Sequence, residues 1–327
     1  MRRRDLLVLL GGTAALRPLA AAAQQPERVR RVGVLIQYPE NNPVGQAFVT
    51  AFAQALGRLG WVEGRNIRID YRFAAGDPVL FKTYAAELVG MSPDAILAGT
   101  SPAVAALREQ TRTIPTVFAL VGDPVGQGFV QSLARPGGNI TGFSSSAPPL
   151  MGKWLQLLKE IAPCVTRVAV IFNPDTTIAA LLNPAIEAAA PSLGMTATLA
   201  PVHDDDEIEA AIAVQAHQRG GGLVALPDGF TDAHRDVIAA AATRHRLPLM
   251  GALVPRAGGL ISYWFDPIDL FAEAASYIDR ILKGASPADL PVQQPTKYSL
   301  TINLKTANAL GLAVPQSLLA RADEVIE

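Results

Sequence analysis

The feature that most constrains the fold is an alternation of short, β-branched runs with longer alanine-rich segments, beginning near residue 31. The short runs are typical of buried strands, and the apolar spacing of the longer segments is typical of amphipathic helices. Since a strand, a helix and a second strand in succession favour parallel pairing with a right-handed crossover, the sequence predicts a doubly wound α/β sheet. Strands are expected at residues 31–36, 66–71, 95–98 and 116–120, with helices at 44–59, 81–89 and 102–110.

The same order of elements recurs in the second half of the chain, together with short stretches of similar sequence. RVGVLI at 31–36 matches RVAVIF at 167–172, LGW at 59–61 matches LGM at 193–195, and PTVFAL at 115–120 matches PLMGAL at 248–253. The matched stretches lie 136, 134 and 133 residues apart, and so steady an offset favours two similar lobes. Three short matches could also arise by coincidence between two generic α/β units.

We therefore predict two Rossmann-like lobes with doubly wound parallel sheets, joined by three crossings that act as a hinge. Residues 30–143 and 258–291 are assigned to the first lobe, and residues 144–257 and 292–327 to the second. The crossings are expected near residues 141–143, 258–259 and 290–292. Residues 135–149 are rich in glycine, serine and proline, which suits the first connection.

The first 23 residues have the composition of an export signal. Three arginines at positions 2–4 precede an apolar run over residues 6–16, and Ala21-Ala22-Ala23 offers a small-residue cleavage site. The paired arginines and the glycines that interrupt the apolar run are typical of a twin-arginine signal, with a Sec signal as the alternative. A membrane anchor is the competing interpretation, but this apolar run is too short to span a bilayer.

The composition of the exported chain limits the classes of function and attachment that we expect for it. Without residues 1–23 its net charge is near −4, which does not suggest nucleic-acid binding. Cys164 is the single cysteine, so no internal disulfide can form, and it lies too far from the leader to carry a lipid. We expect a monomer that is free in the periplasm, with no membrane span in the mature chain.

The sequence lacks the usual patterns for cofactor binding and catalysis. QYPENNPVG follows the first strand, where a dinucleotide site would need a glycine-rich turn, and neither a P-loop nor a nucleophile elbow occurs. The four histidines show no spacing typical of a metal site. We predict no cofactor, no metal and no catalytic residue. An exported two-lobed enzyme acting on a sugar nucleotide stays an alternative, because many enzymes carry no such motif.

The predicted sheets place a set of polar residues and glycines on one cleft. In an open parallel sheet, ligands bind beyond the carboxyl ends of the strands, and two facing lobes would bring both sets of strand ends together. The residues that follow the predicted strands are Gln37, Tyr38, Gly99, Thr100, Ser101, Gly122, Asp123, Asn173 and Asp228.

The stretch AGTSPAVAAL, residues 98–107, is the most informative of these strand ends. Ser101 suits the N-cap of a helix and Pro102 suits its first helical position. The free backbone N–H groups of such a helix start would point into the cleft, where they could receive an anionic group. The alternative is an ordinary turn with nothing bound.

Three longer stretches carry a resemblance to a known family. They are GDPVGQGFVQSLARPGGNITG at 122–142, QPTKYSLTINLKTANALGL at 294–312 and LLARADEVIE at 318–327. The chain resembles the ABC-transporter substrate-binding proteins of the family that includes tryptophan-binding TrpX-type receptors, with the type I periplasmic-binding-protein fold. The resemblance implies a receptor that delivers a small solute to a membrane permease driven by a separate ATPase. A ligand-sensing partner of a signalling receptor would share fold and pocket, and is a second alternative.

The resemblance also implies roles for residues of the cleft, for a solute with a carboxylate such as an amino acid, an aromatic one being the leading candidate. Thr100 and Ser101 would donate their hydroxyls to the carboxylate, and Ala103 its backbone N–H. Asp228 would accept from the ammonium group or, alternatively, form an Asp-Gly turn.

Three further residues have two interpretations each. Asp123 and Asn173 each precede a proline, so they would contact the solute or begin the next helix. SYWFD at residues 262–266 departs from the family pattern of Ser-Tyr-Gly followed by proline. Trp264 in this stretch would either line the pocket or pack at the hinge.

Overall fold

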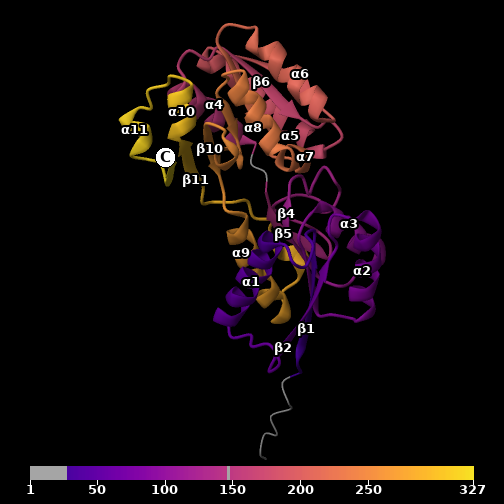
Figure 1. Ribbon diagram of the computed structural model, residues 1–327. Coiled ribbons are helices and arrows are strands. Elements are labelled where there is room, and N and C mark those ends of the chain that lie inside the picture. The colour runs from indigo at the N-terminus through magenta and orange to yellow at the C-terminus, as the bar shows by residue number, and fades with distance from the viewer. Residues whose placement is uncertain (1–27, 146–147) are drawn as a thin grey trace, which may run out of the picture.

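The computed structural model describes residues 28–145 and 148–327, so the expected leader lies outside the described residues. Figure 1 shows two α/β lobes placed end to end, with the chain passing between them more than once. Each lobe contains its own mostly parallel sheet. The predicted fold class is therefore confirmed.

The first lobe, lower in Figure 1, contains a five-stranded parallel sheet. Its strands are β1 (Arg30–Ile36), β2 (Ile67–Phe73), β3 (Ala95–Ala98), β4 (Thr116–Val121) and β5 (Ile140–Ser144), in the order β2-β1-β3-β4-β5. Helices α1 (Pro43–Arg58) and α9 (Pro267–Leu282) pack together on one face, and α2 (Pro78–Gly90) and α3 (Ser101–Gln110) on the other.

Three helices of this lobe begin at the same local sequence, an Asn or Asp followed by proline. Asn42, Asp77 and Asp266 are the N-caps of α1, α2 and α9, and each side chain accepts a backbone N–H of the first turn. Proline suits the position that follows because it has no N–H to leave unpaired. This chemistry fixes where the three helices begin.

The second lobe contains a seven-stranded sheet. Its strands are β6 (Arg167–Phe172), β7 (Thr196–Pro201), β8 (Gly221–Ala225), β9 (Leu249–Gly251), β10 (Ile261–Trp264), β11 (Ser299–Asn303) and β12 (Glu324–Ile326). They lie in the order β12-β11-β10-β9-β8-β6-β7, and every neighbouring pair is parallel except β10 with β11.

Helices and short 3₁₀ turns complete both lobes. The second lobe has α4 (Pro149–Ile161), α5 (Thr177–Ala189), η1 (Ala190–Leu193), α6 (Asp205–Ala216), α7 (Gly229–Ala233), α8 (Arg235–Arg244), η2 (Val254–Ala257), α10 (Leu304–Ala309) and α11 (Gln316–Leu319). The turn η3 (Pro287–Asp289) follows α9 and packs beside β5.

Helices cover both faces of the first sheet, which explains its nearly continuous apolar strands. In β1, Val34 and Ile36 belong to the core beneath α1 and α9, and Leu35 to the core beneath α2 and α3. Between α1 and α9, the rings of Phe48 and Phe271 stack with centroids 4.3 Å apart. This packing holds residues 267–282 in the first lobe although most of that lobe is far away in the sequence.

The second crossing between the lobes differs from its prediction. Ile261 pairs with Met250 of β9, and Tyr263 pairs with Leu300 of β11, so β10 still belongs to the second sheet. The predicted crossing at residues 258–259 is therefore wrong. Gly258, with a φ of 103°, instead closes the turn η2 that leads into β10. The chain returns to the first lobe only after Trp264.

The third crossing lies slightly later than predicted. Gln293 forms a β-bridge with Phe143, and its carbonyl accepts the backbone N–H of Ser144. Gln293 thus still extends the edge of the first sheet, and the chain leaves this lobe between Gln293 and the start of β11. The expected crossing at residues 290–292 is displaced because this bridge pairs the chain with β5.

Two features are absent from the described residues. Within residues 28–145 and 148–327, none of the helices combines the length and apolar character that crossing a membrane requires. The same residues contain no group of three or more His, Cys, Asp or Glu side chains arranged to hold a metal ion.

Candidate functional site

Adjacent strand ends bring Gln37 and Gly99 together at the carboxyl edge of the first sheet. Leu35 of β1 pairs with Ala98 of β3, and Gly99 donates its N–H to the carbonyl of Leu35 at 2.9 Å. A Cβ at position 99 would lie 2.6 Å from Gln37 Oε1 and 3.2 Å from Leu35 O. Glycine is therefore the residue that lets Gln37 occupy this edge.

Two polar atoms at this edge are buried without a partner. They are Gln37 Oε1 and Thr100 Oγ1, and neither has a hydrogen bond within the described part of the chain. Buried polar atoms in native proteins are nearly always paired, because an unpaired one costs about 1–3 kcal/mol. An unpaired carbonyl oxygen beside an unpaired hydroxyl indicates a place prepared for a polar group from outside the chain.

The start of α3 lies one residue earlier than predicted. Thr100, with extended backbone, occupies the N-cap position, and Ser101 is the first helical residue, so the prediction of Ser101 as N-cap is wrong. The Thr100 side chain makes no capping hydrogen bond. Helix geometry leaves the N–H groups of Ser101 and Ala103 without an acceptor inside the helix, and the helix dipole favours an anion there.

Tyr38 is positioned beside this edge and interacts with the second lobe. Its ring packs edge-on against Phe48 with centroids 5.9 Å apart. Burial raises the pKa of the Tyr38 phenol, and the negative charge of Asp232 raises it further, while the positive charge of Arg235 lowers it. Since Asp232 and Arg235 belong to the second lobe, Tyr38 lies within electrostatic range of the opposite side.

In the second lobe, Asp228 is used mainly to build a turn. It is 6% exposed and caps α7: its Oδ1 accepts the N–H groups of Phe230 and Thr231 at 2.8 Å, and its Oδ2 accepts the N–H of Asn173 at 3.1 Å. Burial raises the pKa of this carboxyl, and the three backbone donors lower it. Of the two interpretations left open, these bonds favour the turn.

Asn173 and Asp123 also use their side chains in local turns. Oδ1 of Asn173 accepts the N–H of Asp175 at 2.8 Å, and Oδ1 of Asp123 accepts the N–H of Gly126 at 2.8 Å. Residues 124–128 form turns rather than a helix, so Asp123 does not begin a helix. Asn173 does not cap α5 either, because Thr176 is the N-cap of that helix.

Trp264 is packed within the second lobe. It is 9% exposed, and its ring lies edge-on to Trp154 at 5.7 Å and tilted against Phe265 at 4.5 Å. Trp154 in turn donates its indole N–H to the carbonyl of Tyr263 at 2.7 Å. These contacts favour packing over pocket lining, and they place the bulky pair of the SYWFD stretch in the core where the chain leaves β10.

Some residues of the second lobe near Tyr38 were not predicted from the sequence as part of a site. A small hollow beyond β8 and β9 is lined by Thr231, Asp232, Arg235 and Leu253 among others, and Arg235 Nη1 lies 3.1 Å from Asp232 Oδ1. Thr231 and Asp232 lie in the short helix α7, and its five-residue length gives no helical periodicity from which to predict it.

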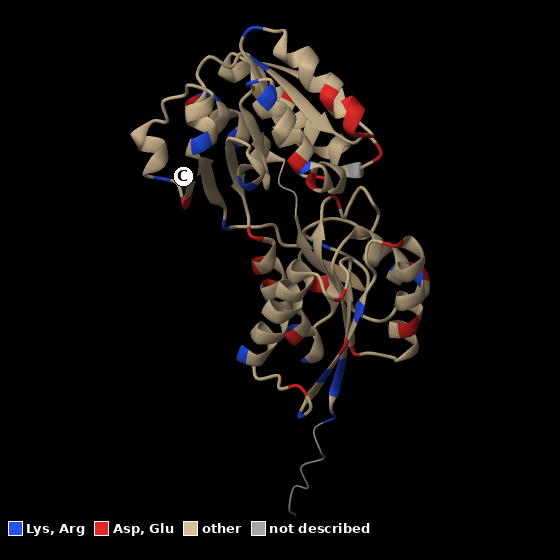
Figure 2. Ribbon diagram, in the orientation of Figure 1, with Lys and Arg blue, Asp and Glu red and all other residues tan. Residues whose placement is uncertain are grey.

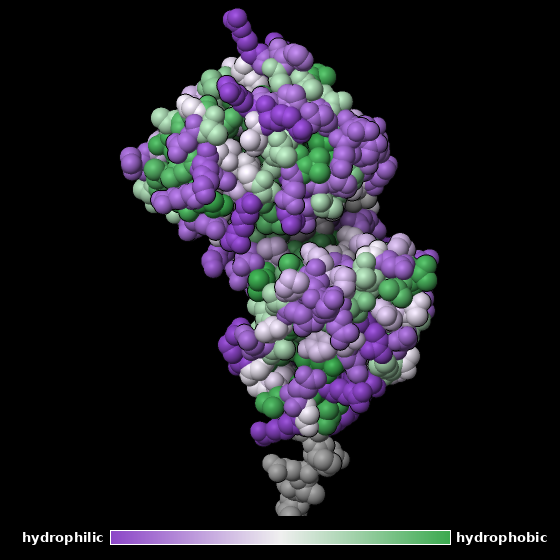
Figure 3. Space-filling view, in the orientation of Figure 1, coloured by the Kyte–Doolittle hydropathy of each residue, from purple (hydrophilic) through white to green (hydrophobic). Residues whose placement is uncertain are grey.

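The two lobes also approach each other at Gly122. A Cβ at this position would lie 2.9 Å from Cδ1 of Ile178 in α5. Figure 3 shows the narrow waist where the lobes meet, and Figure 1 shows α5 and α7 at the side of the second lobe nearest the first. The carboxyl ends of both sheets therefore face this waist.

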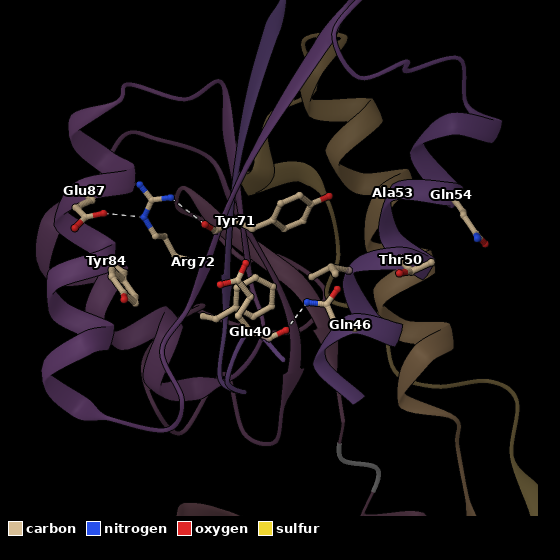
Figure 4. Close-up of a pocket in the computed structure, with 11 residues that line it drawn as sticks. Glu40, Gln46, Thr50, Ala53, Gln54, Tyr71, Arg72, Tyr84 and Glu87 are labelled. Atoms are coloured by element: carbon tan, nitrogen blue, oxygen red, sulfur yellow. Dashed lines mark hydrogen bonds and ion pairs between the residues drawn. The ribbon is translucent and has the colours of Figure 1, made fainter. Parts of the chain in front are cut away.

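A larger cavity, about 670 Å³, lies away from these strand ends. It follows the free edge of β2 between α1 and α2, and Figure 4 shows Tyr71 and Arg72 pointing to opposite sides of that strand. Two of its polar side chains are paired, Arg72 with Glu87 and Gln46 with the carbonyl of Glu40. None of its lining residues carries a buried polar atom without a partner, so the cavity is a weaker candidate than the strand ends.

Comparison with known proteins decides the family. The model of the ABC transporter substrate binding protein family matches residues 34–326. The chain belongs to this family. The fold is that of the type I periplasmic binding proteins, and an Agrobacterium vitis solute-binding protein with bound allitol shares it at a TM-score of 0.62 and 14% identity, over 86% of this chain and 98% of that one.

Two of the more similar relatives of this substrate-binding protein are described with an aromatic amino acid. The tyrosine-binding protein of Clostridioides difficile is 24% identical over 290 residues, which are 88% of this chain and 82% of that protein. An ABC domain from Streptococcus pneumonia, crystallised in complex with L-Trp, is 25% identical with a TM-score of 0.80, over 91% of this chain and 99% of that one. A conserved domain protein from Vibrio cholerae is 30% identical with a TM-score of 0.80, over 91% and 100%.

Proposed function

We propose that this substrate-binding protein is an exported receptor that binds an aromatic L-amino acid between its lobes and delivers it to an ABC permease and its ATPase. The described relatives that bind tyrosine and tryptophan support the ligand class. The leader predicted over residues 1–23 supports export to the periplasm.

The observation that carries the proposal is the unpaired polar edge of the first lobe. A solute carboxylate fits at the start of α3, where Thr100 Oγ1 and the N–H groups of Ser101 and Ala103 would donate to it. Gln37 Oε1 lies beside this point and would accept a hydrogen bond from the ammonium group. Binding would then pair the two buried atoms that lie unpaired at this edge.

The second lobe would complete the site when the lobes close. Solute held first at the Thr100 edge gains contacts from the opposite lobe only after domain motion, so binding energy favours the closed form. Asp232 and Arg235 line the hollow that faces this edge and already interact with Tyr38. Asp228 would support the site by shaping the turn, whether or not it also contacts the solute.

Calorimetric titration with L-tyrosine and L-tryptophan tests the proposal. We expect binding with about micromolar affinity, near −8 kcal/mol, and at least a tenfold loss in the variant Thr100→Val, which removes a hydroxyl but keeps the side-chain shape. Thr113→Val is the matched control, because Thr113 is an exposed threonine of the same lobe away from the strand ends. If neither amino acid produces heat, or if both variants bind alike, the proposed site is wrong.

A further inference from the structure

The end of the first lobe opposite the proposed solute site is strongly basic. It is formed by the starts of β1 and β2 and the last turns of α1 and α9, and Figure 2 shows the positive charges at the lower ends of these strands. We call it the basic end. Its cations are Arg28, Arg30, Arg58, Arg65, Arg68, Arg280 and Lys283.

The carboxylates nearby do not balance these cations. Asp94 is shared by Arg28 and Arg30 at 3.5 and 2.9 Å, and Asp70 is shared by Arg31 and Arg68. Asp279 pairs with Lys283 at 2.7 Å. Arg58, Arg65 and Arg280, all exposed, have no carboxylate partner within the described part of the chain. This excess of positive charge contrasts with the described residues as a whole, whose net charge is −3.

Exposed apolar side chains lie among the cations. Val29, Leu59 and Val62 are 48%, 41% and 48% exposed, and the half-buried ring of Trp61 lies between the last two in sequence. Trp61 is held in place by its indole N–H, which donates to Asp279 Oδ1 at 2.9 Å. Figure 3 shows hydrophobic residues among hydrophilic ones at this lower end of the molecule.

A cavity of about 320 Å³ opens at the centre of the basic end. The indole of Trp61 and the side chains of Leu59 and Leu282 supply its apolar lining, and Arg28, Arg30 and Lys283 supply positive charge. The combination of an aromatic ring, aliphatic groups and several cations is the one found where proteins meet the headgroup region of a bilayer.

Helix geometry alone does not explain this surface. The dipole at a helix C-terminus favours cations there, which accounts for Arg58 in α1 and for Arg280 in α9. It does not account for Arg65, in the turn before β2, or for Arg68, at the start of that strand. Nor does it account for the exposure of apolar side chains beside the cations, which water disfavours.

We propose that the basic end docks on the surface of a bilayer that contains anionic phospholipid, with a headgroup phosphate in the cavity beside Trp61. The cations would interact with the negative surface, and Val29, Leu59 and Val62 would enter the headgroup boundary. Solute binding takes place at the opposite end of the first lobe, so docking leaves that site open. This inference does not depend on the identity of the solute.

Vesicle co-sedimentation tests the proposal with residues 24–327, which lack the predicted leader but retain every described residue. We expect binding to vesicles of phosphatidylglycerol mixed with phosphatidylcholine at low ionic strength, and loss of binding at high salt, where charges are screened. Pure phosphatidylcholine vesicles should not bind. Equal binding to both vesicle types, or no binding to either, would overturn the proposal.

Matched variants localise the surface. Arg58→Gln with Arg65→Gln should lower partitioning onto anionic vesicles by about 25-fold, since each cation near such a surface contributes about fivefold, or about 1 kcal/mol. Arg219→Gln with Lys305→Gln removes the same charge from exposed positions of the second lobe and should leave partitioning nearly unchanged. Equal losses in the two double variants would show that net charge, and not the basic end, governs binding.

Two further experiments distinguish binding to lipid headgroups from purely electrostatic attraction and from binding of free phosphate. Val62→Ser should lower partitioning without changing its salt dependence, because it removes only apolar contact. Inorganic phosphate at constant ionic strength should compete with vesicles if the cavity takes a headgroup phosphate. Saturable phosphate binding by a protein that does not bind anionic vesicles would instead identify a free-phosphate site and overturn the docking proposal.

Discussion

The backbone N–H of Asn173 donates to Oδ2 of Asp228 at 3.1 Å and joins the ends of the neighbouring strands β6 and β8. The other carboxylate oxygen caps α7 through Phe230 and Thr231. Asp228 thus holds the two loops of the second lobe that border the waist. Its main contribution is to the position of other groups, including Asp232 on the next turn.

Replacement of Asp228 should therefore destabilise the fold. In Asp228→Ala, three backbone N–H groups lose their acceptor, and we expect the free energy of unfolding to fall by about 2–3 kcal/mol. Asp228→Asn keeps one carbonyl oxygen for the cap and should cost less. Urea unfolding measures both. An alanine variant that unfolds like the parent but no longer binds an amino acid would instead identify Asp228 as an ammonium partner.

Gly99 allows a second direct test of the site. A methyl group in Gly99→Ala would meet Gln37 Oε1 and the carbonyl of Leu35, so Gln37 must move and the solute should bind at least tenfold more weakly. Gly57→Ala is the control, because a Cβ there meets nothing within 4 Å. It lies in α1 and should raise the free energy of unfolding by about 0.5–1 kcal/mol. Calorimetry that finds equal affinities for both variants would exclude Gln37 from the site.

The pKa of Tyr38 tests whether the two lobes face each other as described. The charge of Asp232 raises the pKa of the Tyr38 phenol and that of Arg235 lowers it. In the absence of solute, Asp232→Asn should therefore lower the pKa of Tyr38, and Arg235→Gln should raise it. NMR titration with ring-labelled tyrosine measures these shifts, and Tyr38→Phe assigns the signal. Shifts of the same sign in the two variants would contradict the arrangement.

The role of Tyr38 and Asp232 can also be tested through closure of the lobes. Small-angle scattering should show that wild-type protein becomes more compact with a bound amino acid, and that Tyr38→Phe with Asp232→Asn becomes less so. Compaction of the double variant equal to that of the wild type would show that the electrostatic interaction between Tyr38 and Asp232 does not contribute to closure. No compaction in either protein would count against the two-lobed receptor itself.

Much of the fold follows from the sequence because strand and helix periodicity is a local property. The apolar runs place β1, β3 and β4 within a residue or so of their ends, and Pro102 places the start of α3 within one. The second crossing could not be predicted in this way. Gly258-Gly259 looks like a break between domains, but the strand that follows pairs with β9 and β11, and that pairing is a long-range contact.

The candidate site could likewise be predicted only in part from the sequence. Gln37, Gly99 and Thr100 could be identified because they follow predicted strands, and the carboxyl ends of parallel strands share an edge. Whether a side chain is free for a ligand depends on its hydrogen bonds in the fold. Asp123, Asn173 and Asp228 have the right chemistry in sequence, but the turns already occupy their oxygens.

Tyr71 provides a prediction for alkaline pH. Burial, together with the nearby charge of Glu63, raises the pKa of this phenol to about 12. An unfolded chain has tyrosine pKa values near 10, so the folded state holds its proton more tightly. The stabilisation is complete below pH about 10 and is lost as the pH rises toward 12, because only the unfolded state then gains by ionisation. Tyr71→Phe should make the unfolding midpoint less dependent on pH in this range, as measured by urea unfolding.

Absorbance titration of the folded proteins gives a second test. The wild type should show one tyrosine that ionises about two pH units above the normal value, and Tyr71→Phe should lack this step. A variant that retains this late step would contradict the assignment.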